Sequence, residues 1–363
     1  MKFIGRILAF VLLGINALVV VLMLVSAYSP YINPHLHPMW SSAGLLFPVF
    51  LLANFLFLCF WAVVNWRVAF FPLLAYICCW GSICTYFPVN FSQNEIPENA
   101  VKILSYNTRA FGNKEKHTKE KPNRILTYLQ ESDADIICLQ EYIVNGKLKK
   151  KDVDYALRKY PYRHYHSLAK GRNGLGCYSK YPILSANPVK YQSKMNGSIA
   201  YQFKIGNDTL LVINNHLESN KIGDSEVNVY QEVMESRDGK KVSSGIWKLM
   251  KKMAEAIKVR AKQAETIKEE TEKFHGKGIV LCGDFNDTPV SYTHRMMSEG
   301  LKDAFVESGN GLGISYNQHR MFFRIDHILL SKNLKVYNCT VDNSLTLPTT
   351  IPFGVIFPGN KGI

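Results

Sequence analysis

Apolar residues form long, almost uncharged runs in the first quarter of the chain and short, interrupted runs in the rest. The long runs cover residues 7–28, 43–64 and 68–87. A helix needs roughly 20 apolar residues to cross the hydrocarbon core, so each run predicts a transmembrane helix. A cleaved signal peptide is the alternative for the first run, but no clear cleavage site follows it. We therefore expect a three-span membrane region over residues 1–88.

The few positive charges in this region predict its orientation. Lys2 and Arg6 precede the first span, and Arg67 lies between the second and the third. Basic residues flanking spans stay on the cytoplasmic side, so the chain after the third span is expected outside. In a bacterium the protein would be a multi-pass inner-membrane protein with a periplasmic domain.

The remaining chain reads as a linker over residues 89–100, followed by an α/β domain. Apolar runs bounded by turn residues predict strands, and two segments with helical periodicity, residues 122–131 and 244–274, predict helices. The strands are expected at residues 101–106, 136–140, 174–179, 200–205, 209–214, 278–282 and 325–330. The pattern indicates a mixed α/β domain with a large sheet content.

Charge separates the two parts of the chain. After residue 95 there are 40 basic and 28 acidic residues, a formal net charge of +12. Such a surface suits a polyanionic substrate, a nucleic acid or an anionic bilayer, although a merely solubilising surface is the alternative. The cysteines have no zinc-ligand spacing, and Cys138 and Cys282 are expected as small buried residues inside strands.

Five predicted strands carry polar residues that can act in catalysis. The segments are Lys-Ile-Leu-Ser-Tyr-Asn ending at Asn107, Ile-Ile-Cys-Leu-Gln-Glu ending at Glu141, Val-Ile-Asn-Asn-His ending at His216, Leu-Cys-Gly-Asp-Phe-Asn ending at Asn286, and Arg-Ile-Asp-His around Asp326. Loops at strand ends commonly carry functional groups on a rigid scaffold. We expect these side chains to meet at one edge of the fold.

In this order the motifs resemble the endonuclease/exonuclease/phosphatase superfamily, which includes neutral sphingomyelinases, inositol-polyphosphate phosphatases and DNase I-like nucleases. The resemblance covers about residues 101–334, and the domain is taken as residues 101–345. It implies a four-layer α/β sandwich of two packed mixed sheets flanked by helices, here preceded by three transmembrane helices.

The resemblance also implies roles for individual residues. Glu141 is the expected Mg²⁺ ligand, with Asn107 beside it and Mn²⁺ as an alternative ion, because hard cations take oxygen ligands. Asp284 would orient or deprotonate the attacking water, Asn286 would hold a phosphate oxygen, and His216 would donate to the phosphate. A phosphoester is anionic and resists attack, so such a site needs both a cation and hydrogen-bond donors.

Further polar residues are expected to bind substrate or to support the site. Asn107, Arg109, Asn173 and Asn214 are the predicted substrate-binding residues, with turn or surface roles as the alternative for Arg109 and Asn173. Asp326 is placed with the catalytic residues, because the family pattern uses this aspartate to orient a histidine. The neighbouring His327 is expected to be structural.

The end of the chain departs from the family pattern, which closes with Ser-Asp-His-x-Pro. Residues 346–363 contain no such motif. Permitted codons for residues 347–361, read from the third letter, encode Ser-Asp-His-Tyr-Pro-Ile-Trp-Cys-Tyr-Phe-Ser-Arg-Glu and a stop, so we hypothesise a frameshift. If the tail is genuine, we expect Asp326 without its partner and one sheet without its closing strand.

The predicted function is divalent-metal-dependent hydrolysis of a phosphate mono- or diester by a membrane-tethered domain. Candidate substrates are a lipid headgroup, a sugar or inositol phosphate, or a nucleic acid, which would make the protein a nuclease. The bilayer is the other expected partner, and no protein partner is inferred. A catalytically impaired, membrane-anchored binding module is the alternative if the tail is genuine.

Overall fold

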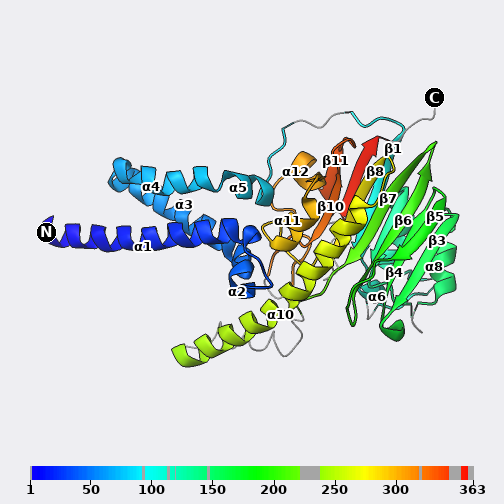
Figure 1. The fold of residues 1–363 in the computed structure, drawn as a ribbon, viewed down its shortest axis with the longest axis horizontal. Coiled ribbons are helices and arrows are strands. Elements are labelled where there is room, and N and C mark those ends of the chain that lie inside the picture. The colour runs from blue at the N-terminus through cyan, green and yellow to red at the C-terminus, as the bar shows by residue number, and fades with distance from the viewer. Residues whose placement is uncertain are drawn as a thin grey trace.

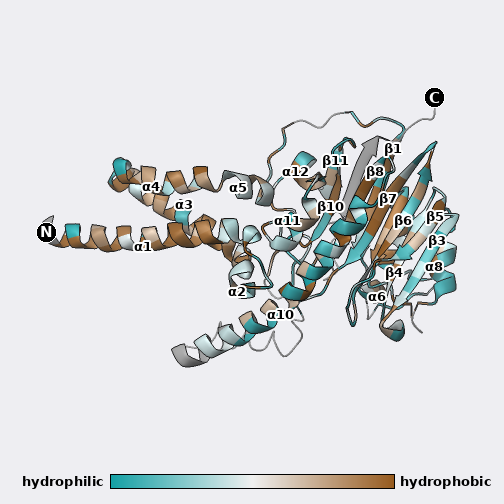
Figure 2. Cartoon of the chain, viewed as in Figure 1, coloured by the Kyte–Doolittle hydropathy of each residue, from teal (hydrophilic) through white to brown (hydrophobic). Residues whose placement is uncertain are grey.

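A computed structural model describes residues 2–91, 95–112, 115–118, 120–144, 148–220, 238–318, 321–342 and 353–358. Apolar helices at the N-terminus extend from one side of a domain built on two sheets (Figure 1). Figure 2 shows that these helices are hydrophobic along most of their length, whereas the domain is hydrophobic mainly inside. The division into an apolar region and an α/β domain agrees with the sequence pattern.

The N-terminal region holds the predicted membrane helices. It consists of α1 (Lys2–Tyr28), η1 (Ser29–Tyr31), α2 (Pro38–Ser41), η2 (Ser42–Leu46), α3 (Phe47–Val64), α4 (Trp66–Cys78) and α5 (Trp80–Tyr86). Two segments, Ile4–Tyr31 and Pro38–Val64, are long and apolar enough to cross a membrane. The third expected span is a pair of helices, α4 and α5, that meet at 64°.

Buried asparagine side chains connect α1, α3 and α4. Asn16 Nδ2 donates to Asn54 Oδ1 at 3.3 Å, and Asn54 Nδ2 donates to the carbonyl oxygen of Pro72 at 3.1 Å. Pro72 lies inside α4. Polar contacts of this kind hold apolar helices together where the hydrophobic effect gives no preference between lipid and protein.

The domain contains two six-stranded mixed sheets. The first has the order β11-β12-β1-β2-β4-β3, and the second has the order β5-β6-β7-β8-β10-β9. The strands of the first sheet are β1 (Ala100–Asn107), β2 (Ile136–Gln140), β3 (Tyr162–Leu168), β4 (Asn173–Ser179), β11 (Asn338–Val341) and β12 (Phe353–Pro358). Those of the second are β5 (Ile183–Pro188), β6 (Gly197–Ile205), β7 (Asp208–His216), β8 (Gly278–Asp284), β9 (Leu301–Asp303) and β10 (Asp326–Ser331).

Helices cover the outer faces of the two sheets, which pack against each other. The shared core includes Ile103, Tyr201 and Val280, and Cys138 and Cys282 are fully buried within it, as expected. The helices are α6 (Arg109–Gly112), α7 (Arg124–Glu131), α8 (Lys150–Ala156), η3 (Ala169–Gly171), α10 (Gly239–Glu272), α11 (Tyr292–Ser298) and α12 (Ala304–Ser308). The predicted four-layer sandwich is confirmed.

The expectation of a missing closing strand is wrong. β12 lies between β1 and β11 and pairs antiparallel with both, with Ile103 opposite Val355 and Cys339 also opposite Val355. The Phe-Gly-Val-Ile-Phe sequence is rich in β-branched and aromatic residues, which favour a strand, and this outweighs the lack of the family motif. The other tail residues, 346–352 and 359–363, lie outside the described residues.

Several specific contacts fasten the N-terminal region to the domain. Arg295 Nε donates to the carbonyl oxygen of Pro30 at 2.9 Å, and Glu265 Oε1 lies 2.9 Å from His35 Nε2. A Cβ placed on Gly44 would lie 1.9 Å from the carbonyl oxygen of Val290, so only glycine fits there. The membrane region and the domain therefore share a built interface.

Candidate active site

The predicted functional residues converge because of the strand directions. β1 runs parallel to β2, β7 runs parallel to β8, and β10 is antiparallel to β8 with Asp326 opposite Asp284. The C-terminal ends of parallel strands share one edge of a sheet, so Asn107 and Glu141 meet at the edge of one sheet. His216 and Asp284 meet at the corresponding edge of the other.

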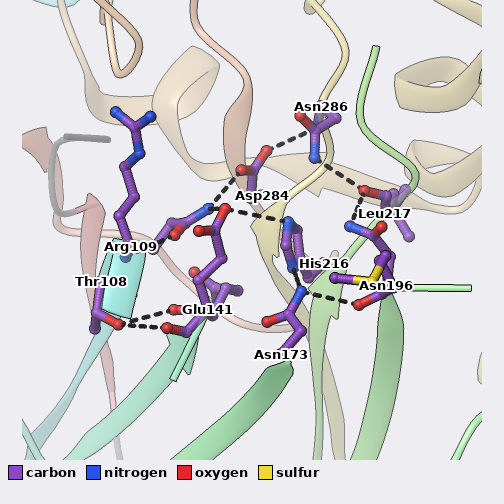
Figure 3. A network of polar contacts seen from close by, with 12 residues as sticks. Thr108, Arg109, Glu141, Asn173, Asn196, His216, Leu217, Asp284 and Asn286 are labelled. Carbon is purple, nitrogen blue, oxygen red and sulfur yellow. Dashed lines mark hydrogen bonds and ion pairs between the residues drawn. The ribbon is translucent and has the colours of Figure 1, made fainter. Parts of the chain in front are cut away.

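A single amide joins the two sheets at this edge. Asn107 Nδ2 donates to Glu141 Oε1 at 3.0 Å and to Asp284 Oδ2 at 2.9 Å. Figure 3 shows Glu141, Asp284 and His216 pointing toward one another. The prediction that residues about 180 positions apart in sequence form one site is thereby supported by direct contacts.

The turns after these strands adopt an uncommon backbone conformation. Arg109, Glu141 and Asn286 have φ values of 44°, 48° and 52°, in the left-handed region. Such conformations cost of order 1 kcal/mol or more each and persist where surrounding bonds enforce them. Here the backbone N–H of Ala110 donates to the carbonyl oxygen of Glu141 at 3.0 Å, and Thr108 Oγ1 donates to the same oxygen at 3.0 Å.

His216 is held in one tautomer by Asn173. Asn173 Oδ1 accepts from the backbone N–H of Gly174 at 2.7 Å, and its Nδ2 donates to the carbonyl oxygen of Met195 at 2.8 Å, which fixes the amide orientation. The same Nδ2 lies 3.4 Å from His216 Nδ1. An amide nitrogen only donates, so Nδ1 accepts and Nε2 carries the proton. Nε2 lies 3.8 Å from Glu141 Oε1, on the site side of the ring.

Two buried carboxyl groups give the site its electrostatic character. Burial raises the pKa of Asp284, and the charge of Glu141 raises it further, while the His216 imidazole opposes this. Burial and the charge of Asp284 raise the pKa of Asp326 well above its usual value. Within the described part of the chain, neither carboxylate oxygen of Asp326 has a hydrogen-bond partner, as expected from the missing histidine.

These residues fit a hard divalent cation. Three acidic side chains lie together around the Asn107 amide, whose Oδ1 accepts from the backbone N–H of Arg109 at 3.1 Å, and the mutual repulsion of the acids favours a positive ion among them. Glu141 is the accessible member, with a side chain 33% exposed. Oxygen donors of this kind, with room for water on one side, suit Mg²⁺ or Mn²⁺.

The other predicted substrate-binding residues lie at different depths. Asn214 is fully buried between the sheets, where its Nδ2 donates to the carbonyl oxygens of Leu139 and Gly176 and its Oδ1 accepts from Gln140. This amide joins the two sheets beneath the site. The Arg109 side chain projects to one side of the cluster (Figure 3).

The loop after β8 is organised by Asn286 and Asp287. The backbone N–H of Asn286 donates to Asp284 Oδ1 at 2.8 Å, and Asn286 Nδ2 donates to the carbonyl oxygen of Leu217 at 2.9 Å. Asp287 Oδ2 accepts from Thr293 Oγ1 at 2.8 Å. Asn286 thus links the Asp284 loop to the His216 loop, and Asp287 shapes the turn.

Two supporting residues on α10 were not predicted. Arg260 is fully buried, and it donates to the carbonyl oxygen of Glu218 at 2.9 Å and to Asp287 Oδ2 at 3.3 Å. Gln263 Oε1 accepts from the backbone N–H of Glu218 at 2.9 Å. Basic and amide residues on a lysine-rich helix give no sequence signal of such a role, because their partners are distant in sequence.

His327 belongs to a second buried cluster beside the site. His294 Nε2 lies 2.8 Å from Asp303 Oδ2, and His327 Nε2 lies 2.9 Å from the carbonyl oxygen of Asp287. Burial lowers the pKa of His327 well below its usual value, so the ring is neutral. Its bond to the Asp287 loop agrees with the structural role expected for it.

Comparison with known proteins places this arrangement in a class. The chain matches the Endonuclease/Exonuclease/phosphatase family over residues 104–346, and it belongs to that family. Residues 8–86 match a domain of unknown function, DUF8431. No curated protein matches the chain. Members of the family are metal-dependent phosphoesterases.

Solved structures share the fold at low sequence identity. A family protein from Bacteroides thetaiotaomicron is 18% identical, with a TM-score of 0.50, covering 74% of this chain and 98% of that one. D. rerio TDP2 complexed with a single-strand DNA product is 14% identical, with a TM-score of 0.50 and coverage of 72% and 99%. The human Nocturnin catalytic domain is 13% identical, with a TM-score of 0.50 and coverage of 74% and 97%. At these identities the likeness establishes the fold alone.

Proposed function

We propose that this chain is a membrane-anchored phosphoesterase that hydrolyses a phosphate mono- or diester with Mg²⁺ or Mn²⁺. The observation that carries the proposal is the Asn107 amide, which bonds to Glu141 from one sheet and to Asp284 from the other. It brings an accessible carboxylate, a buried carboxylate and a histidine into one site.

Each residue has a task that follows from its surroundings. Glu141 and Asn107 would hold the ion, which supplies charge neutralisation for the phosphate and an acidified water. Asp284 is held by Asn107 and by the backbone N–H of Asn286, so its carboxylate is positioned to orient a water and accept its proton. His216 would donate from Nε2 to a phosphate oxygen and stabilise the developing charge.

Substrate-binding roles for Asn107, Arg109, Asn173 and Asn214 stay part of the proposal. Arg109 is the one cationic residue of these four, and a guanidinium suits a phosphate group. Asn173 contacts the site through His216. If the gene carries the alternative reading frame, the tail would contain the Ser-Asp-His-Tyr-Pro motif and would add a histidine beside Asp326. Sequencing the gene around Leu345 decides between the two frames.

The proposal is tested with the purified full-length chain in detergent. Bis(p-nitrophenyl) phosphate and p-nitrophenyl phosphate separate diesterase from monoesterase activity. We expect turnover of at least one of them with Mg²⁺ or Mn²⁺ and none after chelation, with recovery on adding the ion back. Turnover that continues unchanged in the presence of a chelator would contradict the metal-dependent mechanism.

A second candidate is a membrane-anchored binding module. The observation that favours it is the carboxyl group of Asp326, which is buried without a hydrogen-bond partner among the described residues. A module of this kind would bind a phosphoester without hydrolysing it. Equilibrium binding of a phosphodiester without any turnover would select this function.

A further inference from the structure

Helix α10 continues beyond the domain that it covers. Its C-terminal half is buried through Ala254, Ile257, Ala261 and Ile267, and the helix packs on α11 and α2. In Figure 1 the N-terminal half projects past the sandwich and past α2, on the side where the apolar helices leave the domain. We call residues 239–253 the α10 arm.

The sequence of the α10 arm is amphipathic. Apolar residues at positions 242, 246, 249, 250 and 253 recur at helical spacing and continue the stripe that is buried further along the helix. The opposite face carries lysines, and the arm contains five of them and no acidic residue. In the sequence, the apolar spacing of the buried half of the helix therefore continues into the half that projects from the domain.

The exposed side chains of the arm suit a lipid headgroup layer. Trp247 is 59% exposed, and Lys248 and Lys251 are exposed. Tryptophan favours the membrane–water interface, and lysines are attracted to anionic headgroups. The neighbouring α2 carries Trp40, which is 60% exposed, at the end of the first two apolar helices.

We propose that the α10 arm lies in the headgroup layer of the bilayer that holds α1 and α3, and that it binds anionic lipid there. The inference rests on the proposed membrane anchoring. Charge complementarity selects an anionic bilayer, and the contact between α10 and α2 makes this surface continuous with the anchor. Through Arg260 and Gln263 the same helix bonds to the loop after β7, so the arm holds the active site at the membrane surface.

The test uses the full-length chain in vesicles of phosphatidylcholine, with or without phosphatidylglycerol. The emission of Trp247 is obtained as the difference between the wild type and Trp247→Phe, and it is measured with lipids brominated at shallow or deep positions. We expect quenching mainly by shallow bromines, and stronger quenching in the anionic vesicles. Lys248→Glu/Lys251→Glu should reduce this quenching at least roughly twofold, because two attractive charges become repulsive.

Lys332→Glu/Lys335→Glu is the matched control, since it makes the same charge change on exposed lysines after β10, at the opposite edge from the site. It should leave the quenching unchanged, and neither pair should alter turnover of a soluble phosphodiester. Quenching of Trp247 by aqueous acrylamide but not by brominated lipid would overturn the inference. Protection from both quenchers would place a protein surface on the arm and would also overturn it.

The anchoring itself is checked by alkaline carbonate extraction of the same vesicles. A chain that stays in the membrane with an unquenched Trp247 refutes the α10 inference and leaves the anchoring intact. Release of the chain by carbonate refutes both. Loss of enzymatic activity affects neither readout, so a failure of the proposed catalysis is distinguishable.

Discussion

Replacing Glu141 with Gln separates the catalytic role of this carboxylate from its effect on stability. Glu141 raises the pKa of Asp284 and of Asp326 through its charge, so the three acids repel one another. Glu141→Gln keeps the shape of the side chain and removes that charge. Without divalent metal, the variant should therefore be at least as stable as the wild type.

With Mg²⁺ present the order should reverse. A ligand at about 100 times its Kd stabilises the folded state by about 2.7 kcal/mol. For a domain of this size that corresponds to a rise in Tm of roughly 5–11 °C, because each kcal/mol shifts Tm by about 2–4 °C. Glu141→Gln should lose most of this rise and at least ~100-fold of turnover, since a hard-ion site loses an anionic oxygen ligand.

The assay is thermal unfolding of the full-length chain in detergent over a Mg²⁺ titration, with phosphodiester turnover measured in parallel. Glu131→Gln is the matched control, because Glu131 is an exposed carboxylate on α7. The control should retain both the Mg²⁺-dependent rise in Tm and the activity. A Glu141→Gln variant with an unchanged Mg²⁺ response would refute the assignment of Glu141 as a ligand.

Three further predictions test other parts of the account. A reporter fused after Glu95 should be active if it is of the alkaline-phosphatase type and inactive if it is cytoplasmic, and the reverse result would place the domain inside. A chain whose tail carries the Ser-Asp-His-Tyr-Pro frame should turn over phosphodiester ~10² to 10⁴-fold faster than this chain, because it gains a general acid–base group, and equal rates would show that this histidine is dispensable. Gly283→Ala should lower the free energy of unfolding by about 3 kcal/mol or more in denaturant titrations, since a Cβ there would lie 2.0 Å from the carbonyl oxygen of Asn215 at a φ of 132°. Gly300→Ala, at a φ of 79° with open space around it, is its control and should cost only about 1 kcal/mol.

The strands that the sequence predicted all lie inside the sheets, although β12, which also lies inside its sheet, was not predicted. β2 was expected over the residues that it occupies, and its five residues are all buried. β3 was missed, because its Tyr-Arg-His-Tyr-His segment lies at a sheet edge and is only partly buried. β5 was missed for a similar reason, since its pairing with β6 contains an irregularity and it also lies at an edge. An edge strand needs no continuous apolar run, so periodicity does not reveal it.

The ends of buried strands were the main sequence signal for the candidate site residues. Asn107, Glu141, His216 and Asp284 lie at or directly after such ends, and strand direction brings them together. The left-handed turn at Glu141 and the Asn173 bond that orients His216 depend on tertiary contacts, which no local pattern encodes. The supporting role of Arg260 was not predicted for the same reason, because Arg260 and its partner Asp287 are more than 25 positions apart in sequence.

The most direct test of the central claim is the initial rate of phosphodiester hydrolysis by the full-length chain and by Asp284→Asn, measured across a Mg²⁺ titration. Asp133→Asn serves as the control, because the Asp133 side chain is 82% exposed. The account predicts a Mg²⁺-dependent rate that the control retains and that Asp284→Asn lowers by at least ~100-fold, because an amide accepts no proton from the attacking water. Equal rates for the wild type and Asp284→Asn, at any Mg²⁺ concentration, would contradict it.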